Sequence, residues 1–328
     1  MIAAGPDIAD VGALRERLAG QTALTPIVRC AAIEEAIGGS TRVFAKLEFL
    51  QRTGTFKARA ALATLYELSP EQLAIGVTAV SAGNHAIATA YAAQAVGTSA
   101  KVVMIRSANP SRIRSCRSYG AEVVFADDVH QAFDIAERIQ KDEGRYLVHP
   151  FEGPAVATGT GTIGLEICEQ CADFDTVIVP VGGGGLIGGI ANVVKRLRPS
   201  CEVIGVEPVG ADTMHRSLAS GKPAKIDAVR TIADSLGAPF ALPYSFGLCQ
   251  LHVDRLAIVD DLQLRRAMGY LFVAMKIAVE PACAASTAAL LGPLRKELTG
   301  RCIVLVMCGS NIDWVTFEQQ AIFDDGTG

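Results

Sequence analysis

A lysine in a short turn is the first residue whose type and setting could support chemistry. Lys57 lies within residues 53–59, TGTFKAR, where a turn-forming Thr-Gly pair leads into a helix-compatible series. A charged lysine is unfavourable at a helix start, because the helix N-terminus carries partial positive charge. A free amine could instead react with a carbonyl group and form a Schiff base. The alternative is a solvated surface lysine, which is the usual state of an isolated Lys side chain.

Four consecutive glycines at residues 182–185 form a second candidate site. They follow an apolar segment and precede Leu186, where a helical pattern starts. Such a loop can direct successive backbone N–H groups at a phosphate, and the helix dipole adds to the attraction. The loop lacks the Lys and Ser/Thr ending of a nucleotide-binding P-loop. Two alternatives stay open here, a tight strand-to-helix turn and a dinucleotide site that would use Glu207.

A polar loop at residues 81–85, SAGNH, is a third candidate site. It follows a predicted strand and opens a predicted helix. Backbone N–H groups at this position can bind a carboxylate, and the hydroxyl of Ser81 can add another donor. The alternative is that Ser81 is an ordinary helix N-cap. His85 is equally compatible with loop packing and with proton transfer.

Cys308 follows an apolar segment at residues 303–307, which predicts a thiol at the carboxyl end of a strand. Ligands of open α/β sheets usually bind at this edge. The alternative is a buried, inert cysteine. The chain has nine cysteines, and Cys168 and Cys171 have C-x-x-C spacing without the second pair that a zinc site needs. We expect most of the cysteines to be reduced core residues.

Short β-rich segments alternate with amphipathic stretches along the chain. The predicted strands lie at residues 43–47, 76–80, 101–105, 122–125, 176–181, 202–206 and 303–307. The predicted helices lie at residues 84–96, 129–142, 186–197 and 262–279. This alternation is typical of βαβ units in parallel sheets that are covered on both faces. We therefore predict an α/β protein.

Length and composition narrow the possible functions. The 328 residues are 50% hydrophobic with a net charge of -4, which is enough to bury the cores of two domains. Scattered Lys and Arg residues argue against a nucleic-acid partner. The N-terminus lacks the pattern of a secretory signal, so we expect a cytoplasmic protein. Two long uncharged stretches contain glycines, a proline or polar side chains that argue against a membrane span.

Together these segments resemble the pyridoxal-phosphate enzymes of the threonine dehydratase and serine racemase group, called fold type II. The resemblance extends from about Thr25 to Trp314. It implies two open, twisted parallel-sheet α/β domains with the cofactor between them. The small domain would comprise residues 50–148, and the large domain residues 1–49 plus 149–328. The resemblance also implies a homo-oligomer, a dimer or a tetramer.

The resemblance assigns roles to particular residues. Lys57 would bind the cofactor as an imine and later remove the Cα proton, and Cys308 would contact the cofactor ring nitrogen. Asn84 would contact the phenolic oxygen of the cofactor. The remaining cofactor-binding residues would be Phe56, Gly182, Gly183, Gly184, Gly185 and Leu186. The substrate carboxylate would be bound by the loop of Ser81, Ala82, Gly83, Asn84 and His85.

Additional matches to the group concern acidic residues. Glu280 corresponds to an acidic position near the cofactor, although a helix-end ion pair is an alternative. Glu207, the Ala211 carbonyl and Thr213 fall where some relatives bind a divalent cation. Thr213 replaces an acidic ligand there, which weakens the oxygen set. We therefore make no prediction about a metal.

Departures from the group's pattern bear on activity and substrate. Serine racemases carry a serine where Ala82 stands, and a methyl group cannot donate a proton, so the sequence favours elimination over racemisation. Ile87, Thr160 and Ser235 replace residues that are common around the substrate space. These replacements suggest a substrate bulkier than threonine, such as phenylserine.

The resulting prediction is a pyridoxal-phosphate-dependent ammonia-lyase. It would convert a β-hydroxy-α-amino acid, which is threonine, serine or a bulkier analogue such as phenylserine, to a 2-oxo acid and ammonia. Within the same cofactor class, the alternatives are a β-replacement enzyme that resembles cysteine synthase and an amino-acid racemase. Outside that class, the competing hypotheses are a dinucleotide-dependent enzyme and an amino-acid-binding module without turnover.

Overall fold

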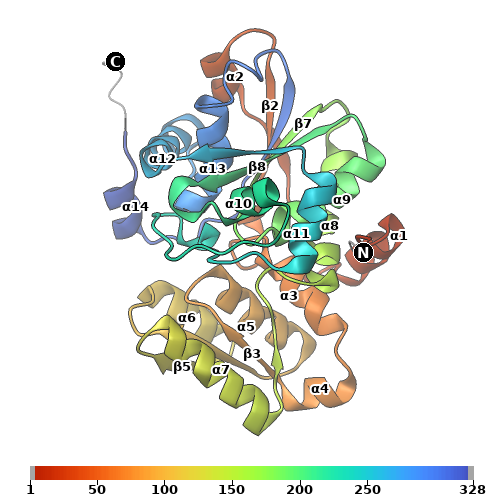
Figure 1. Ribbon diagram of the computed structural model, residues 1–328, viewed down its shortest axis with the longest axis vertical. Coiled ribbons are helices and arrows are strands. Elements are labelled where there is room, and N and C mark those ends of the chain that lie inside the picture. The colour runs from red at the N-terminus through yellow and green to blue at the C-terminus, as the bar shows by residue number, and fades with distance from the viewer. Residues whose placement is uncertain (1–3, 324–328) are drawn as a thin grey trace.

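The computed structural model describes residues 4–323, which form two α/β bodies, each built on its own sheet (Figure 1). The four-stranded sheet has the order β5-β4-β3-β6, and the six-stranded sheet has the order β1-β2-β10-β7-β8-β9. The strands of the small sheet are β3 (Val77–Val80), β4 (Ala100–Ile105), β5 (Glu122–Ala126) and β6 (Tyr146–Leu147). Those of the large sheet are β1 (Ile27–Arg29), β2 (Arg42–Lys46), β7 (Thr176–Pro180), β8 (Glu202–Pro208), β9 (Arg255–Val259) and β10 (Cys302–Val306).

Helices cover the sheets and connect their parallel strands. The helices of the smaller body are α4 (Pro70–Ile75), α5 (Asn84–Val96), α6 (Pro110–Ser118) and α7 (Val129–Glu143), and α3 (Lys57–Tyr66) lies between the bodies (Figure 1). The others are α1 (Ile8–Arg17), α2 (Ala31–Ile37), α8 (Pro154–Gln170), α9 (Gly185–Leu197), α10 (Thr213–Ser220), α11 (Pro243–His252), α12 (Asp261–Met275), α13 (Pro281–Leu291) and α14 (Trp314–Gln320). Three short 3-10 helices are η1 (Glu48–Leu50), η2 (Val209–Ala211) and η3 (Asp234–Leu236).

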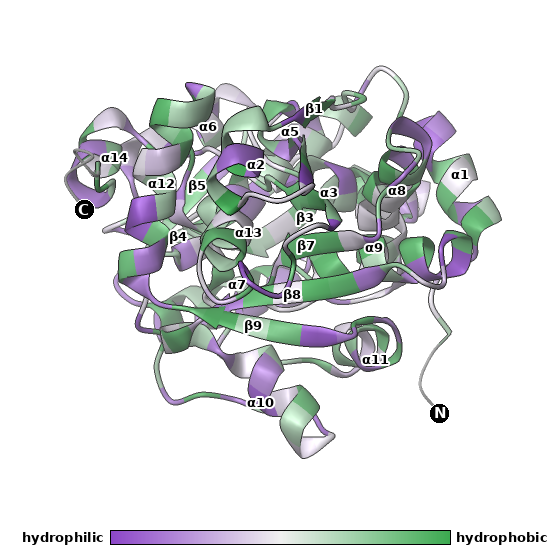
Figure 2. Cartoon of the chain, turned by 90° about the horizontal axis from the view of Figure 1, so that it is seen from above, coloured by the Kyte–Doolittle hydropathy of each residue, from purple (hydrophilic) through white to green (hydrophobic). Residues whose placement is uncertain are grey.

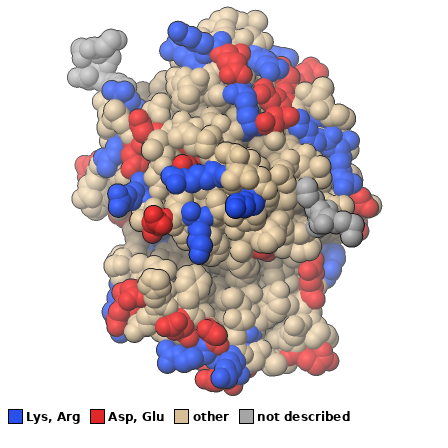
Figure 3. Space-filling model, viewed as in Figure 1, with Lys and Arg blue, Asp and Glu red and all other residues tan. Residues whose placement is uncertain are grey.

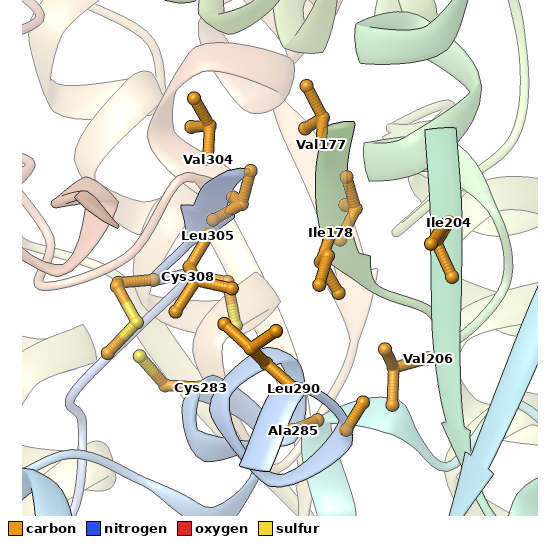
Figure 4. Packing of buried hydrophobic residues seen from close by; sticks show 14 of the residues in the cluster. Val177, Ile178, Ile204, Val206, Cys283, Ala285, Leu290, Val304, Leu305 and Cys308 are labelled. Atoms are coloured by element: carbon orange, nitrogen blue, oxygen red, sulfur yellow. The ribbon is translucent and has the colours of Figure 1, made fainter. Parts of the chain in front are cut away.

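The core of the larger body lies on both faces of its central strands. Every residue of β7 and β10 is buried, and the hydrophobic colouring of β7 and β8 is visible in Figure 2. Figure 4 shows Ile178 and Leu305 of these strands above Leu290 of α13. A strand that is buried on both faces needs apolar side chains at successive positions, which explains the continuous apolar runs of the sequence.

The predicted strands agree closely with those of the structure, and each is found within one or two residues of its predicted bounds. Strands β1, β6 and β9 were missed. All strand pairs are parallel, as expected, except that the edge strand β1 is antiparallel to β2. The helix predicted at residues 262–279 ends at Met275, because Lys276 adopts a left-handed conformation with φ 60°.

The structure also bears on the cysteines, on possible membrane spans and on the surface charge. All nine cysteines are free thiols, and eight of them are buried. None of the helices formed by residues 4–323 combines the length and hydrophobicity needed to span a bilayer. On the face shown in Figure 3, Lys and Arg are interspersed with Asp and Glu, so the described residues there form no continuous basic surface.

The parallel topology brings the candidate loops to the carboxyl ends of strands. Residues 81–83 connect β3 to α5, residues 181–184 connect β7 to α9, and Cys308 follows β10. Helices that start directly after central strands direct their N-terminal N–H groups toward the same edge of a sheet. All four strands of the small sheet lie within residues 50–148, and we keep the predicted division at 50 and 148 as a proposal.

Two buried ion pairs share one carboxylate and hold α3 against the larger body. Arg59 donates hydrogen bonds to Glu166 of α8 at 2.6 and 2.8 Å and to Glu48 at 2.9 Å. Lys46 of β2 also donates to Glu166, at 2.5 Å. All four side chains are at most 3% exposed. Because these charges are buried and each is paired, the cluster specifies how α3 packs on β2 and α8.

We expect the substitution Arg59→Met to lower the free energy of unfolding by about 3 to 5 kcal/mol, because it leaves buried carboxylates without their partner. Denaturant unfolding would measure the change. The matched control is Arg15→Met, since Arg15 pairs with Glu169 of the same helix but both side chains are substantially exposed. The control should cost less than about 1 kcal/mol. Equal losses in the two variants would contradict the importance that we assign to the buried cluster.

Candidate active site

A cavity of about 390 Å³ contains all of the predicted site residues. Its walls come from both bodies, from the carboxyl ends of strands and from the first turns of α3, α5, α7 and α9. The predicted residues that line it are Phe56, Lys57, Ser81, Ala82, Gly83, Asn84, His85, Gly182, Gly183, Gly184, Gly185, Leu186 and Cys308. Segments that are far apart in sequence therefore meet at one place.

Lys57 is the first residue of α3, and its amine lies inside the cavity. Its Nζ donates a hydrogen bond to the Pro150 carbonyl at 2.5 Å and lies 5.0 Å from the centre of the Phe56 ring. Burial lowers the pKa of this amine to about 8, although Cys308 and Glu280 partly oppose the shift. The surface that Lys57 still exposes faces the cavity. A larger fraction of this amine is therefore unprotonated at physiological pH than of an ordinary lysine, and Lys57 lines the cavity where a ligand could reach it.

The glycine loop requires glycine at most of its positions. A Cβ on Gly183 would lie 2.2 Å from the Phe151 ring, and one on Gly185 would lie 2.4 Å from the Phe151 carbonyl oxygen. Gly184 has φ +89°, a left-handed conformation that other residues rarely adopt. This residue is the N-cap of α9 and has no side chain to satisfy the first N–H groups. The loop thus offers unobstructed donors and a helix dipole to an anion.

The loop of residues 81–85 turns sharply before α5. Ser81 Oγ accepts a hydrogen bond from the Gly83 N–H at 3.1 Å, and Gly83 itself occupies the N-cap position of α5. The alternative of Ser81 as the helix N-cap is therefore wrong. His85 Nε2 lies 2.8 Å from the Val148 carbonyl oxygen, and burial lowers the His85 pKa to about 3. The imidazole is neutral, so it can hold the loop but is a poor source of protons at neutral pH.

A polar chain links α5 to the larger body at the base of the cavity. Asn311 Nδ2 donates to Asn84 Oδ1 at 2.7 Å, and Asn84 Nδ2 donates to Glu280 Oε1 at 2.7 Å. Burial raises the Glu280 pKa to about 7, while Arg112, with a nitrogen 3.8 Å away, opposes the shift. Within the described residues, Glu280 Oε2 is buried without a hydrogen-bond partner. The site therefore holds a carboxyl group that can change protonation near neutral pH.

Cys308 lines the cavity and keeps its proton. A hydrogen bond with Cys283 and burial both raise the pKa of the Cys308 thiol well above its usual value. Figure 4 shows the Cys283 side chain beside Cys308, below the end of β10. The Cys308 carbonyl accepts a hydrogen bond from the Phe56 N–H at 3.1 Å, which connects this strand end to the turn before Lys57. The thiol is a neutral group on the cavity wall.

Two residues that we expected around the substrate space do not line the cavity. Ile87 is buried in the core of the smaller body, because its position on α5 faces the sheet. Thr160 lies within α8, behind the glycine loop, and donates a hydrogen bond to the Gly185 carbonyl at 2.8 Å. The expectation was wrong for both residues, whereas Ser235 does line the cavity.

The region considered for a cation is occupied by internal hydrogen bonds. The Glu207 carboxylate accepts from the N–H groups of Met214 and His215 at 2.8 and 2.7 Å, so it caps α10. Thr213 Oγ1 donates to the Ala238 carbonyl at 2.6 Å. Among residues 4–323 no group of three or more His, Cys, Asp or Glu side chains has an arrangement that could hold a metal ion.

Several lining residues were missed by the sequence analysis. His149, Pro150 and Phe151 follow β6, and their place after a strand was the signal that could have identified them. His149 Nδ1 accepts hydrogen bonds from the N–H groups of Phe151 and Glu152, and burial lowers the His149 pKa to about 4. Besides the expected Ser235, residues 236–240 and the first turns of α7 also contribute, but no sequence pattern indicates that they reach the cavity.

Comparisons with known proteins agree with this geometry. A phenylserine dehydratase from Ralstonia pickettii is 51% identical over 96% of each chain, and an L-threonine ammonia-lyase from Thermotoga maritima is 38% identical over 88% of this chain and 71% of the relative. The solved structure of maize serine racemase has a TM-score of 0.91 with 33% identity over 97% of each chain.

The processed form of threonine deaminase isoform 2 from Solanum lycopersicum also has this fold, with a TM-score of 0.88 and 30% identity over 96% of this chain and 94% of that chain. Residues 18–309 match the family described as pyridoxal-phosphate dependent enzyme. This match includes every residue that we predicted to bind the cofactor or the substrate. The chain therefore belongs to the family of pyridoxal-phosphate-dependent enzymes with the fold of threonine deaminase and serine racemase.

Proposed function

We propose that this protein is an ammonia-lyase that uses pyridoxal phosphate to eliminate water from a β-hydroxy-α-amino acid, with release of a 2-oxo acid and ammonia. One observation carries the proposal. The Lys57 amine, with a pKa of about 8, shares a cavity with an anion-binding helix N-terminus and with a second loop of backbone donors. The amine can react with the aldehyde of the cofactor. One anion site suits the phosphate of the cofactor, and the other suits the carboxylate of an amino acid.

The residues that line the cavity fit the cofactor. Gly182–Gly185 would hold the phosphate, since the first N–H groups of α9 have no side-chain cap and the loop lines the cavity. The close contact of Gly183 and Gly185 with Phe151 leaves no room for a side chain that would alter the loop. Lys57 would hold the aldehyde carbon, and the neutral thiol of Cys308 would face the ring nitrogen. When bound, pyridoxal phosphate supplies a carbonyl group for the amine and a conjugated ring that accepts the electrons released at Cα.

The protein's own groups would then orient the substrate and move its protons. N–H groups of the Ser81–Asn84 loop would bind the substrate carboxylate and bring Cα close to the Lys57 amine. With its lowered pKa, that amine accepts the Cα proton more readily at neutral pH than an ordinary lysine, which is almost fully charged there. A neutral thiol at position 308 leaves the ring a moderate electron acceptor, which favours prompt loss of the β-hydroxyl over long-lived carbanion chemistry.

The choice between elimination and racemisation depends on which proton donors lie near the substrate. Racemisation needs a proton donor on each face of the planar carbanion. Ala82 lines the cavity with a methyl group, and burial keeps His85 and His149 uncharged near neutral pH. These observations support elimination as the main reaction.

We further propose that the substrate carries an aryl group on Cβ. The support is the 51% identity to a relative named phenylserine dehydratase. Several aromatic side chains also line the cavity, namely Phe56, Phe133, Phe151 and Phe240. A dimeric or tetrameric assembly remains a prediction.

We expect Gly185→Ala to weaken the binding of pyridoxal phosphate by about tenfold or more, because a hydrogen bond to a charged group contributes about 1.5 to 3 kcal/mol. Titration of the apoprotein, followed by visible absorbance, would measure the affinity. Gly12→Ala is the control, since a Cβ there meets nothing within 4 Å. Unchanged affinity in Gly185→Ala, with the fold intact by thermal melting, would place the phosphate elsewhere.

The rate at which the apoprotein incorporates pyridoxal phosphate should rise with pH, with a midpoint at about 8, and level off about one pH unit higher. The reason is that only the unprotonated amine reacts, and burial lowers the Lys57 pKa to about 8 from its usual 10.5. Stopped-flow absorbance across a pH range of about 6 to 10 would reveal the midpoint. A midpoint near the usual lysine value would mean that the amine is solvated rather than buried.

Lys57→Ala should reduce ammonia release from phenylserine and threonine by about 100-fold or more, because the variant loses the group that moves the Cα proton. Ammonia and 2-oxo acid can be measured together with the D-isomer of each substrate. The wild-type protein should form ammonia much faster than D-isomer. Activity of Lys57→Ala at the parent rate would refute the proposed role of this residue.

A further inference from the structure

The first two turns of α7 carry large apolar side chains that are only half buried. Val129 is 55% exposed and Phe133 is 50% exposed, and both line the cavity together with Ala132. An isolated exposed apolar residue needs no explanation, but a contiguous group on a cavity wall is typical of a ligand site. The bond-breaking steps of the proposed elimination do not require these residues.

The placement of this group follows from how α7 starts and packs. Asp128 accepts a hydrogen bond from the Gln131 N–H at 2.8 Å, and Gln131 Oε1 accepts one from the Asp127 N–H at 2.6 Å. These bonds define where the helix begins and therefore which side each residue faces. Val129 and Phe133 are four residues apart, so they lie on one side of the helix.

That side of α7 continues the face that packs on the small sheet. Ala132, Ala136 and Ile139 are buried against Val103 and neighbouring residues in one apolar cluster. Val129 lies one turn before this buried face, and Phe133 lies beside it, next to Ala132. Both side chains line the cavity and stay half exposed.

The larger body contributes apolar groups to the same cavity. Phe240 and Pro239 line it, and the ring of Phe240 lies 6.3 Å from that of Phe151 at an interplanar angle of 54°. Neither the lining residues of α7 nor those at 236–240 include a charged side chain. These walls therefore suit an uncharged aromatic group, since aromatic rings attract one another at such separations and a carboxylate would lose its hydration without a partner.

We propose that Val129 and Phe133 of α7, together with Phe240, form an aryl subsite that determines the substrate preference of this enzyme. The subsite takes the ring on Cβ of the substrate, while the Ser81–Asn84 loop holds the carboxylate. This inference rests on the proposed elimination reaction and deepens it. It predicts a preference for β-aryl substrates over threonine, and a weak response to substrates with an anionic side chain.

The first test compares kcat/KM for phenylserine, threonine and hydroxyaspartate in the wild type and in Phe133→Ala. We expect Phe133→Ala to lose about tenfold or more for phenylserine but less than about threefold for threonine, because apolar contacts discriminate by about tenfold or more per group lost. Phe133→Leu should recover part of the loss, since it restores apolar volume. Wild-type kcat/KM for hydroxyaspartate should lie below that for phenylserine.

Phe323→Ala is the matched control. Phe323 is 47% exposed, packs against Phe272 and does not line the cavity. Its removal should leave the preference between phenylserine and threonine unchanged. Equal losses on both substrates in Phe133→Ala, or no loss on phenylserine, would overturn the aryl subsite.

A binding measurement separates this proposal from the proposed reaction. The probe is 3-hydroxy-3-phenylpropanoate, which has the aryl group and the carboxylate but no amine, and calorimetry on the holoenzyme would measure its affinity. Phe133→Ala should weaken this probe by about tenfold while leaving 3-hydroxybutanoate within about threefold. If the wild type eliminated no substrate yet bound the aryl probe preferentially, the reaction would be wrong and the subsite right. If elimination occurred without any aryl preference in binding or turnover, the subsite would be wrong.

Discussion

The position of the Lys57 amine depends on buried ion pairs next to it in α3. Helix α8 takes part in these ion pairs and connects α3 to the rest of the site. Glu166 of α8 pairs with Arg59, two residues after Lys57, and with Lys46 of the large sheet. Nearer the start of the same helix, Thr160 holds the Gly185 carbonyl. A single helix therefore contacts both the element that carries the amine and the loop that we propose for the phosphate.

Close helix packing makes this arrangement possible. A Cβ on Gly159 would lie 2.7 Å from the Arg59 carbonyl oxygen, and a Cβ on Gly189 would lie 2.0 Å from Thr160 Oγ1. Glycine at these two positions lets α3 and α9 approach α8 closely. Because buried charges cannot be left unpaired without a large loss of stability, α3 cannot shift along α8 independently. The distance between the amine and the glycine loop is thereby held by helix packing.

Burial has a common effect on the ionisable groups of the cavity. It disfavours charge, so it lowers the pKa values of Lys57, His85 and His149 and raises that of Glu280. Near neutral pH the cavity therefore holds an amine that is partly unprotonated, two neutral imidazoles and a carboxyl group that titrates in the same range. Such a set favours proton transfer through Lys57, because the histidines accept protons only at much lower pH.

Much of the site could be predicted because its motifs are local. The residues of TGTFKAR, SAGNH and the glycine loop each follow a strand or open a helix, and ligands of parallel α/β sheets usually bind at such strand ends. The packing of the two sheets brings these segments to one cavity. Ile87 and Thr160 were misplaced for the opposite reason. Which face of a helix lines a cavity depends on the neighbour that the helix packs against. Here Ile87 of α5 is buried in the core, and Thr160 of α8 lies behind the glycine loop.

The sequence by itself determined the α/β class, the strands of the central sheets, and the lysine and the glycine loop that we propose for the site, since periodicity, glycine runs and strand-end motifs are set by neighbouring residues. Only the tertiary structure decided the surroundings of that lysine. The burial that lowers its pKa, the placement of His149 and the position of α7, which brings Val129 and Phe133 to the cavity, all arise from contacts between distant segments. Such contacts depend on how two sheets and their helices pack, and packing is a property of the whole chain rather than of any one segment.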